Sequence, residues 1–499
     1  MSFTARSAVL NSARLARYGR MVLPSLAVMA CAIAAVGIAH AADAPPPLPV
    51  NNDPHLLSAA MAEPAPDPVP EGSSGYPVST GTVTTAPDAR RWAIFGQMTL
   101  TTMSTLGFHQ PYAGDHSLPA HDLRETFDAT LYLGGRVWQG GEIWVNGEVD
   151  QGFGVGNTLG MAGYASGEAY KLGSASPYTR LQRAFVRQTF DLGGAHSDVD
   201  AQANQMAGTQ AANRLVLTVG KFSPVDIFDS NTYAHDPRGD FLNWSIIDAG
   251  AFDYAGDPWG YSYGAAAELT LASWTGRLGV FNMSDVPGGM KPTTNFSELE
   301  VAGELEHRHT LLGHAGTVRA GVWLIHGRLG RYDDAIAWGL ANGAAPDTNQ
   351  VLTMHTRLGG YINAEQGLTD TLGVFLRASD ADGAYGAYDF TDIDRSLSLG
   401  LSLGGKGWHR AGDTVGLALV ANQISKAGQA YFAAGGMGLL IGDGQLPHPG
   451  TEKIAEVYYA WRPWKPVAVT FDEQLVFNPA YNKDRGPVDI VGVRLHVAF

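Results

Sequence analysis

A chain of 499 residues is longer than an ordinary single-core domain, so either several domains or one large barrel is expected. Only 16% of the residues are charged, glycine is abundant (62 residues), and the mean hydropathy is −0.07. This composition excludes a disordered chain and a helical membrane protein, and the net charge of −15 argues against nucleic-acid binding.

The first 41 residues read as a signal peptide. Four arginines precede the apolar stretch Met21–Ala39, and Ala39-His40-Ala41 fits a small-x-small cleavage site. An uncleaved anchor is the alternative, because the apolar stretch is long. Cys31, the single cysteine, lies inside this stretch, so the mature chain would contain neither a disulfide nor a thiolate metal site. Residues 42–90 are rich in proline and predict a flexible periplasmic spacer.

Residues 91–499 show a different pattern, in which apolar residues alternate with polar or small ones. In 127–138, for example, Leu131 and Leu133 share one face, whereas Tyr132 and Arg136 share the other. This period of two is typical of strands with two different faces. Sixteen such segments are predicted, at approximately 92–108, 127–138, 142–151, 180–191, 213–222, 260–272, 274–283, 297–308, 316–328, 352–365, 370–379, 393–404, 413–421, 452–463, 467–477 and 487–499.

The connections between these segments favour a transmembrane barrel. They are mostly brief after even-numbered strands and long after odd-numbered strands, with 192–212 as the exception. An even strand count with short periplasmic turns and long extracellular loops is typical of an outer-membrane barrel, in which closure satisfies every backbone group. A soluble β-sandwich would need a partner sheet instead. We expect the last strand to pair with the first, with Val491 and Phe499 facing lipid and Arg494 and His496 facing the lumen.

Several stretches resemble the carbohydrate-selective outer-membrane porins of the OprB type. The resemblance is carried by ETFDATLYLGGRVWQGGEIWVNGE (125–148), RLQRAFVRQTFDLGG (180–194), GKFSPVDIFDSNTYAHDPRGDFLNWSIIDAGAFDYAGDPWGYSYGAA (220–266) and NPAYNKDRGPVDIVGVRLHVAF (478–499). It implies an all-β, sixteen-stranded antiparallel barrel that passes sugars by diffusion.

The best candidates for a pore constriction lie on the second to fourth strands. Arg136, Glu142 and Glu148 are on the inward faces of adjacent hairpin strands, and Arg183 and Arg187 share a face of the next strand. Guanidinium groups donate hydrogen bonds to sugar hydroxyls, and carboxylates accept them. We predict that these residues form an eyelet for passing sugars. The alternative interpretation is an arginine–glutamate ladder that only braces the barrel wall.

The connection 223–259 is the third long loop. In general porins the third external loop folds inward and narrows the channel, and we expect the same here. Asn243 and Trp244 are candidate sugar contacts, since aromatic rings stack on the apolar faces of sugars. The alternative is a solvated loop whose aspartates cap turns.

The predicted function is passive, selective diffusion of glucose-like monosaccharides and related sugars across the bacterial outer membrane, after export through the periplasm. No catalytic residue, metal site or cofactor is predicted. A barrel-borne enzyme or adhesin acting through its extracellular loops is the alternative function. Expected partners are small sugars, outer-membrane lipid and lipopolysaccharide, but not nucleic acid. The sequence leaves open which sugar is preferred and whether the barrels form a homo-oligomer.

Overall fold

The computed structural model describes residues 91–169 and 173–499. The chain divides into two units, Met1–Glu71 and Gly72–Phe499, and every described residue belongs to the second unit. The predicted signal peptide and spacer (1–90), including Cys31, lie outside the described residues and stay predictions.

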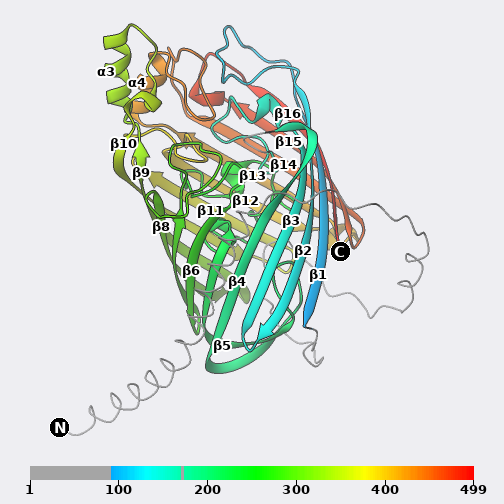
Figure 1. Ribbon diagram of the computed structural model, residues 1–499. Coiled ribbons are helices and arrows are strands. Elements are labelled where there is room, and N and C mark those ends of the chain that lie inside the picture. Colours follow the sequence, from blue (N-terminus) through cyan, green and yellow to red (C-terminus); the bar gives the residue numbers. More distant parts are fainter. Residues whose placement is uncertain (1–90, 170–172) are drawn as a thin grey trace, which may run out of the picture. The chain divides into compact units, whose positions relative to one another are not determined.

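Within the described residues, sixteen antiparallel strands close into one barrel, in which β16 pairs with β1 (Figure 1). All sixteen predicted strands are confirmed, as is the pairing of the last strand with the first. The strands are β1 (Trp92–Thr105), β2 (Leu123–Trp138), β3 (Gly141–Gly152), β4 (Ser174–Val199), β5 (Gly208–Phe222), β6 (Ser262–Leu271), β7 (Trp274–Asn282), β8 (Leu299–Leu311), β9 (His314–Leu329), β10 (Thr353–Gly367), β11 (Leu372–Ala381), β12 (Arg395–Gly404), β13 (Thr414–Gln423), β14 (Glu452–Trp464), β15 (Val467–Phe477) and β16 (Val488–Ala498).

The two faces of each strand differ as their alternation predicts. On β2, Leu131 is 47% exposed on the outer face, whereas Tyr132 is 5% exposed on the inner face. On β16, Val493 is 45% exposed, and the Arg494 side chain is buried and donates inward to the Pro237 carbonyl. His496 contacts the buried Thr99 on the same inner face. The predicted partition of the last strand into lipid-facing and lumen-facing residues is therefore confirmed.

Long and short connections lie at opposite ends of the barrel. Among the connections after even-numbered strands the longest is 405–413, and the connection 223–261 at the other end, hereafter loop 3, is far longer. None of the helices in the described residues is long and apolar enough to cross a membrane. The helical segments are η1 (Val155–Asn157), η2 (Pro224–Asp226), α2 (Trp244–Ile247), α3 (Tyr332–Asn342), η3 (Thr348–Val351), η4 (Gly405–Trp408), α4 (Lys426–Ala433) and η5 (Pro479–Tyr481).

Loop 3 folds into the lumen, as expected from its position in the chain. Its Phe252 ring lies 4.9 Å from the ring of Trp323 on β9, and its Phe241 ring lies 4.9 Å from the ring of Tyr458 on β14. All four side chains are nearly or fully buried. Loop 3 therefore spans the lumen and forms much of the buried core.

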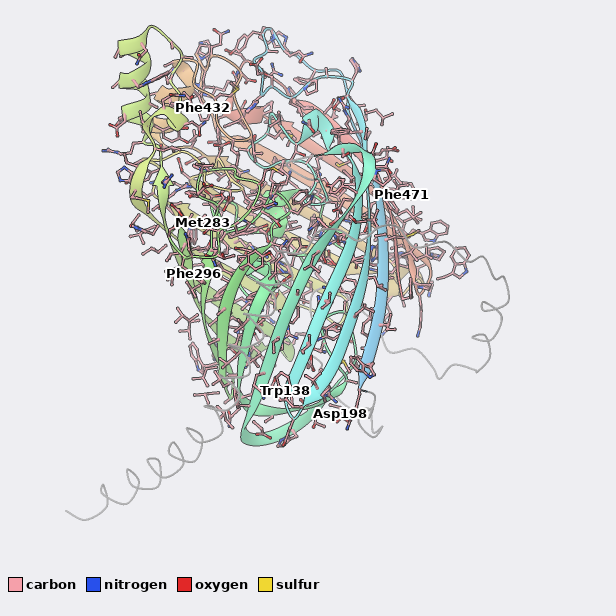
Figure 2. All side chains as sticks on the ribbon, in the orientation of Figure 1. Trp138, Asp198, Met283, Phe296, Phe432 and Phe471 are labelled. Carbon is pink, nitrogen blue, oxygen red and sulfur yellow. The ribbon has the colours of Figure 1, made fainter. Side chains whose placement is uncertain are left out.

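The β4–β5 hairpin differs from the prediction. Both strands continue beyond the predicted ends, so that the exceptional connection shrinks from 192–212 to 200–207, hereafter the hairpin tip. Gly193 and Gly194 take φ values of +94° and +97° where the pairing register shifts, a backbone conformation that glycine adopts without strain. The hairpin curves across the short-turn end of the barrel (Figure 1), and Asp198 lies at the same end as Trp138 (Figure 2).

Candidate functional site

Strand β4 presents a row of inward-facing residues along the lumen. Cross-strand pairing places Arg187 opposite Glu142 and Arg183 opposite Asn146 on β3, and places Arg180 opposite Glu148 after a register shift. Each of the three arginines meets a different part of the structure. The predicted eyelet residues therefore separate into three sites at successive heights along the wall.

The site nearest the periplasmic turns brings together Arg136, Glu142 and Arg187. A guanidinium nitrogen of Arg136 lies 3.8 Å from one Glu142 oxygen, and a nitrogen of Arg187 lies 4.0 Å from the other. Their side chains are 32%, 17% and 24% exposed, respectively. These long, partly hydrated ion pairs leave donor and acceptor positions accessible, which is the property predicted for an eyelet.

The hairpin tip enters this same site from the periplasmic end. Arg136 donates to the carbonyl oxygen of Ala207 over 2.7 Å, and Arg187 donates to the carbonyl oxygen of Asn204 over 2.6 Å. The amide of Asn146 on β3 donates to the Asn204 side chain over 2.8 Å. The tip therefore occupies some of the arginine donors that the sequence analysis assigned to sugars.

The hairpin tip and loop 3 approach each other inside the barrel. A small cavity is lined by Phe185 and Arg187 on β4, by Asn204 of the tip, and by Asp226 and Ile227 of loop 3. The hairpin tip, which enters from the periplasmic end, and loop 3, which enters from the extracellular end, therefore border one narrow part of the lumen.

Glu148, the middle member of the predicted eyelet, lies in a buried cluster. Its carboxylate pairs with Arg180 and accepts hydrogen bonds from Gln182 and, over 2.6 Å, from Thr130. The Glu148 side chain is 1% exposed. Its oxygens have no surface left for a sugar hydroxyl, so Glu148 fits the bracing-ladder interpretation and not the predicted direct contact.

Arg183 attaches loop 3 to the barrel wall. Its guanidinium group makes two hydrogen bonds with Asp226, of 2.8 and 2.6 Å, and lies 4.8 Å from the centre of the Tyr261 ring. The side chain is 13% exposed. Arg183 therefore helps to set the position of loop 3 where it begins.

The predicted contacts in loop 3 itself are buried. Asn243 is 0% exposed, caps α2 through the backbone nitrogen of Ser245, and donates to Gln474 on β15 over 3.1 Å. Trp244 is 2% exposed, and its ring stacks on Tyr164 at 5.3 Å between centres. The prediction that these two residues touch sugar is corrected on this ground, because their side chains hold the loop against the wall.

Buried charges fix loop 3 at two further places. Arg377 on β11 contacts a carboxylate oxygen of Asp229 at 3.0 Å and donates to the Ile246 carbonyl over 2.8 Å. Arg238 of the loop lies 3.3 Å from Asp128 on β2 and 3.3 Å from Glu168. Ion pairs this deeply buried are costly to break, because removing one partner strands the other charge.

Burial also changes the protonation of loop 3. Desolvation, with repulsion from Asp229, raises the pKa of Asp248 to about 8. Desolvation, with repulsion from Asp236, raises the pKa of Asp240 to about 7. Asp248, which is 4% exposed, is therefore mostly protonated at neutral pH.

A second charged row, which the sequence did not single out, lies on β6, β7 and β8, separated from β4 only by β5. Arg277 on β7 contacts Glu268 at 3.0 Å, Glu304 at 2.5 Å and Glu306 at 2.9 Å. Glu268 and Arg308 are 24% and 25% exposed. The predicted strand 297–308 carries Glu304, Glu306 and Arg308 on the face expected to point into the barrel, and this pattern could have predicted the row.

Within the described ranges, no group of three or more His, Cys, Asp or Glu could hold a metal ion.

Comparison with known proteins agrees with this geometry. The sequence model of the OprB family, carbohydrate-selective porins, matches residues 116–499. Among solved structures, OprB of Pseudomonas putida is similar with a TM-score of 0.61 and 14% identity, over 82% of this chain and 94% of that one. The outer-membrane channel DcaP of Acinetobacter baumannii matches at 12% identity and a TM-score of 0.48, over 85% and 100% of the two chains. At 14% identity, the likeness to OprB of Pseudomonas putida shows the fold alone. No curated protein sequence matches the chain.

Proposed function

Because the chain belongs to the OprB family of carbohydrate-selective porins, we propose that glucose-like sugars cross its lumen passively, past Arg136, Glu142 and Arg187. The protein is an outer-membrane porin and not an enzyme.

The observation that carries the proposal is the contrast in exposure among the lumen charges. Glu148 and Arg377 are buried, at 1% and 2%, whereas Arg136 and Arg187 are 32% and 24% exposed. A solute can exchange hydrogen bonds only with groups that water also reaches. Such groups replace part of the lost hydration of a sugar without holding it tightly.

The hairpin tip forms the floor of this narrow region. The carbonyl oxygens of Ala207 and Asn204 accept from the arginines where a sugar hydroxyl would otherwise accept. Replacing one neutral oxygen acceptor by another costs little, since a net hydrogen bond contributes only about 1 kcal/mol. A hydroxyl group of a passing sugar therefore replaces a carbonyl oxygen of the tip as the acceptor of an arginine hydrogen bond.

Liposome swelling with purified protein tests the path. Vesicles containing the protein should swell in isotonic glucose without an energy source. Arg187→Ala should lower the ratio of glucose flux to the flux of an amino acid of similar size by roughly two- to tenfold, the equivalent of one net hydrogen bond. Glu142→Gln should change the same ratio, because it removes the counter-charge of both arginines.

Arg410→Ala is the matched control, since Arg410 is also ion-paired but lies in the turn 405–413, 42% exposed. This variant should leave the glucose ratio unchanged. Swelling by the unaltered protein combined with no effect of Arg187→Ala would remove the site near the turns from the path. No swelling in any small sugar would contradict passive permeation itself.

A further inference from the structure

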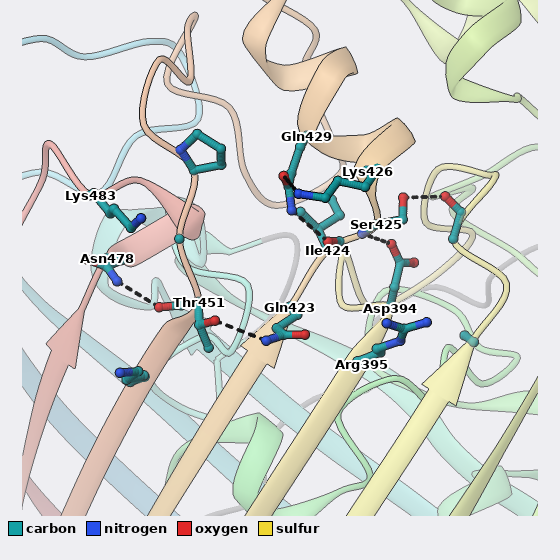
Figure 3. A pocket seen from close by; sticks show the side chains of 15 residues that line it. Asp394, Arg395, Gln423, Ile424, Ser425, Lys426, Gln429, Thr451, Asn478 and Lys483 are labelled. Carbon is teal, nitrogen blue, oxygen red and sulfur yellow. Dashed lines mark hydrogen bonds between the residues drawn. The ribbon is translucent and has the colours of Figure 1, made fainter.

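A cavity of about 630 Å³ lies at the extracellular ends of β12, β13 and β14, far from the site near the periplasmic turns. Figure 3 shows the strand ends below this cavity and α4 above it. Its lining includes Arg395, Lys426, Lys453 and Lys483. Nothing in the sugar path uses this cavity.

The cavity has an unusual concentration of positive charge. Three of the chain's eight lysines line it, in a protein whose net charge is −15. Among the residues that the structure describes, no ion pair is formed by Lys426, Lys453 or Lys483. Lys426 makes only a 3.3 Å hydrogen bond to Gln429. The ammonium groups are therefore available to an anion.

The acidic groups nearby are already occupied. Asp394, the single carboxylate in the lining, contacts Arg357 at 3.2 Å and accepts from the Ser425 backbone over 2.7 Å. Asp380 pairs with Arg395 at 2.6 Å on the exposed surface. The three lysines thus give the cavity a net positive field without a neutralising carboxylate.

The basic groups lie at the extracellular ends of strands whose outer faces are apolar. Arg395, Gln423 and Lys453 are exposed at outward-facing strand positions, at the extracellular ends of β12, β13 and β14. Farther along the same outer faces are Leu397, Leu419 and Val457, which are 47%, 49% and 40% exposed. Polar contacts above an apolar band match a lipid with a charged headgroup and acyl chains.

We propose that this cavity binds the phosphate groups of a phosphorylated outer-leaflet glycolipid of the lipopolysaccharide type. Lys426, Lys453 and Lys483 donate to the phosphate oxygens, and the acyl chains cover Leu397, Leu419 and Val457. Lysine binds phosphate as a compact point charge with three donors. The lipid bound here fixes α4 and the neighbouring loop ends at the membrane surface.

Binding of lipid A to the folded protein in detergent micelles tests this proposal. The double substitution Lys453→Gln/Lys483→Gln should weaken binding of bisphosphorylated lipid A roughly 25-fold, since each lysine near an anionic lipid surface contributes about fivefold in affinity. Lipid A without phosphates should bind the unaltered protein about as weakly. Glucose-driven liposome swelling should not change, which shows that the variant barrel is folded and open.

The matched control is Lys406→Gln/Lys465→Gln. These lysines lie in the connections 405–413 and 465–466, at the opposite ends of the same strands, and they carry the same total charge. The control should retain full affinity for lipid A. Equal affinity in both double variants would overturn the proposal. Competition by inorganic phosphate at the concentration at which lipid A binds would also overturn it, because the site would then recognise phosphate without the lipid.

Discussion

Loop 3 and the hairpin tip enter the barrel from opposite ends, and they are held in different ways. Loop 3 is fixed by buried charges, such as Asp229 against Arg377, whose side chains are 0% and 2% exposed. The hairpin tip is fixed by hydrogen bonds to the partly hydrated Arg136 and Arg187, by a buried hydrogen bond to Asn146, and by Met206, which is 4% exposed in the core. Displacing loop 3 leaves buried charges without a partner, whereas displacing the tip frees two arginines that water already reaches in part.

This contrast assigns different roles to the two segments. Breaking a buried ion pair costs about 3–5 kcal/mol, whereas losing a solvated hydrogen bond costs about 1 kcal/mol. Loop 3 is therefore a permanent part of the wall that narrows the lumen. The hairpin tip is the replaceable part, and it is the part that can yield to a solute.

The largest effect is expected from Arg377→Ala. This change leaves Asp229 buried without its cation and removes the bond to the Ile246 carbonyl. The free energy of unfolding should fall by about 3–5 kcal/mol, measured by urea unfolding in lipid vesicles. Arg124→Ala is the control, because Arg124 is 44% exposed in its pair with Asp122 and should cost at most about 1 kcal/mol. Similar losses in both variants would contradict the claim that loop 3 is the rigid segment.

A pH series tests the dry packing of loop 3. Because the pKa of Asp248 is raised to about 8, the folded protein keeps a proton that the unfolded chain releases above about pH 4. The stabilisation is complete below about pH 4 and is lost as the pH rises through about 8, by at most about 1.4 kcal/mol per pH unit. Asp248→Asn replaces the titrating carboxyl group by a neutral amide. The stability of this variant relative to the unaltered protein should therefore improve steadily between pH 4 and 8.

Thermal unfolding midpoints of the two proteins, compared across that pH range, give the measurement. Asp370→Asn is the matched control, since Asp370 is 84% exposed at the opposite end of the barrel. Its difference from the unaltered protein should change far less between pH 4 and 8 than that of Asp248→Asn, because water hydrates an exposed carboxylate in both the folded and the unfolded chain. An equally small change for Asp248→Asn would show that Asp248 is hydrated and that loop 3 is not dry.

The barrel was predictable from the sequence because lipid imposes a strict alternation on every strand that crosses it. That rule ends where the membrane ends, and there the prediction was wrong. Strand β4 continues through exposed residues such as Ala195 and Asp198, which have no lipid-facing side and no apolar period. The same strand also begins earlier than predicted, at Ser174. Pairing outside the membrane depends on the partner strand and leaves no local pattern.

The candidate site was predictable only as far as the direction of its side chains. Parity placed Arg136, Glu142, Glu148 and Arg187 on the inner wall, and the structure places them there. The alternation along a strand shows which face a side chain occupies, but it does not show which inward-facing side chains a distant segment covers. Glu148 is buried by its own wall and by Arg238 of loop 3, which lies 3.8 Å away, and Arg187 is met by the hairpin tip. These partners follow from the paths of the loops, which the strand period does not encode.

The smallest change in stability, and the sharpest test of the replaceable tip, is Asn146→Ala. The variant removes the 2.8 Å hydrogen bond to the Asn204 side chain and leaves that buried acceptor without its donor, so the free energy of unfolding should fall by about 1–3 kcal/mol. The barrel remains folded, but the tip leaves the lumen more often. Single-channel recordings in a planar bilayer should therefore show higher mean conductance and more frequent transitions between current levels. Thr209→Ala is the control, since Thr209 is exposed on the same hairpin. Steady, unchanged currents for Asn146→Ala would mean that the tip is held as firmly as loop 3.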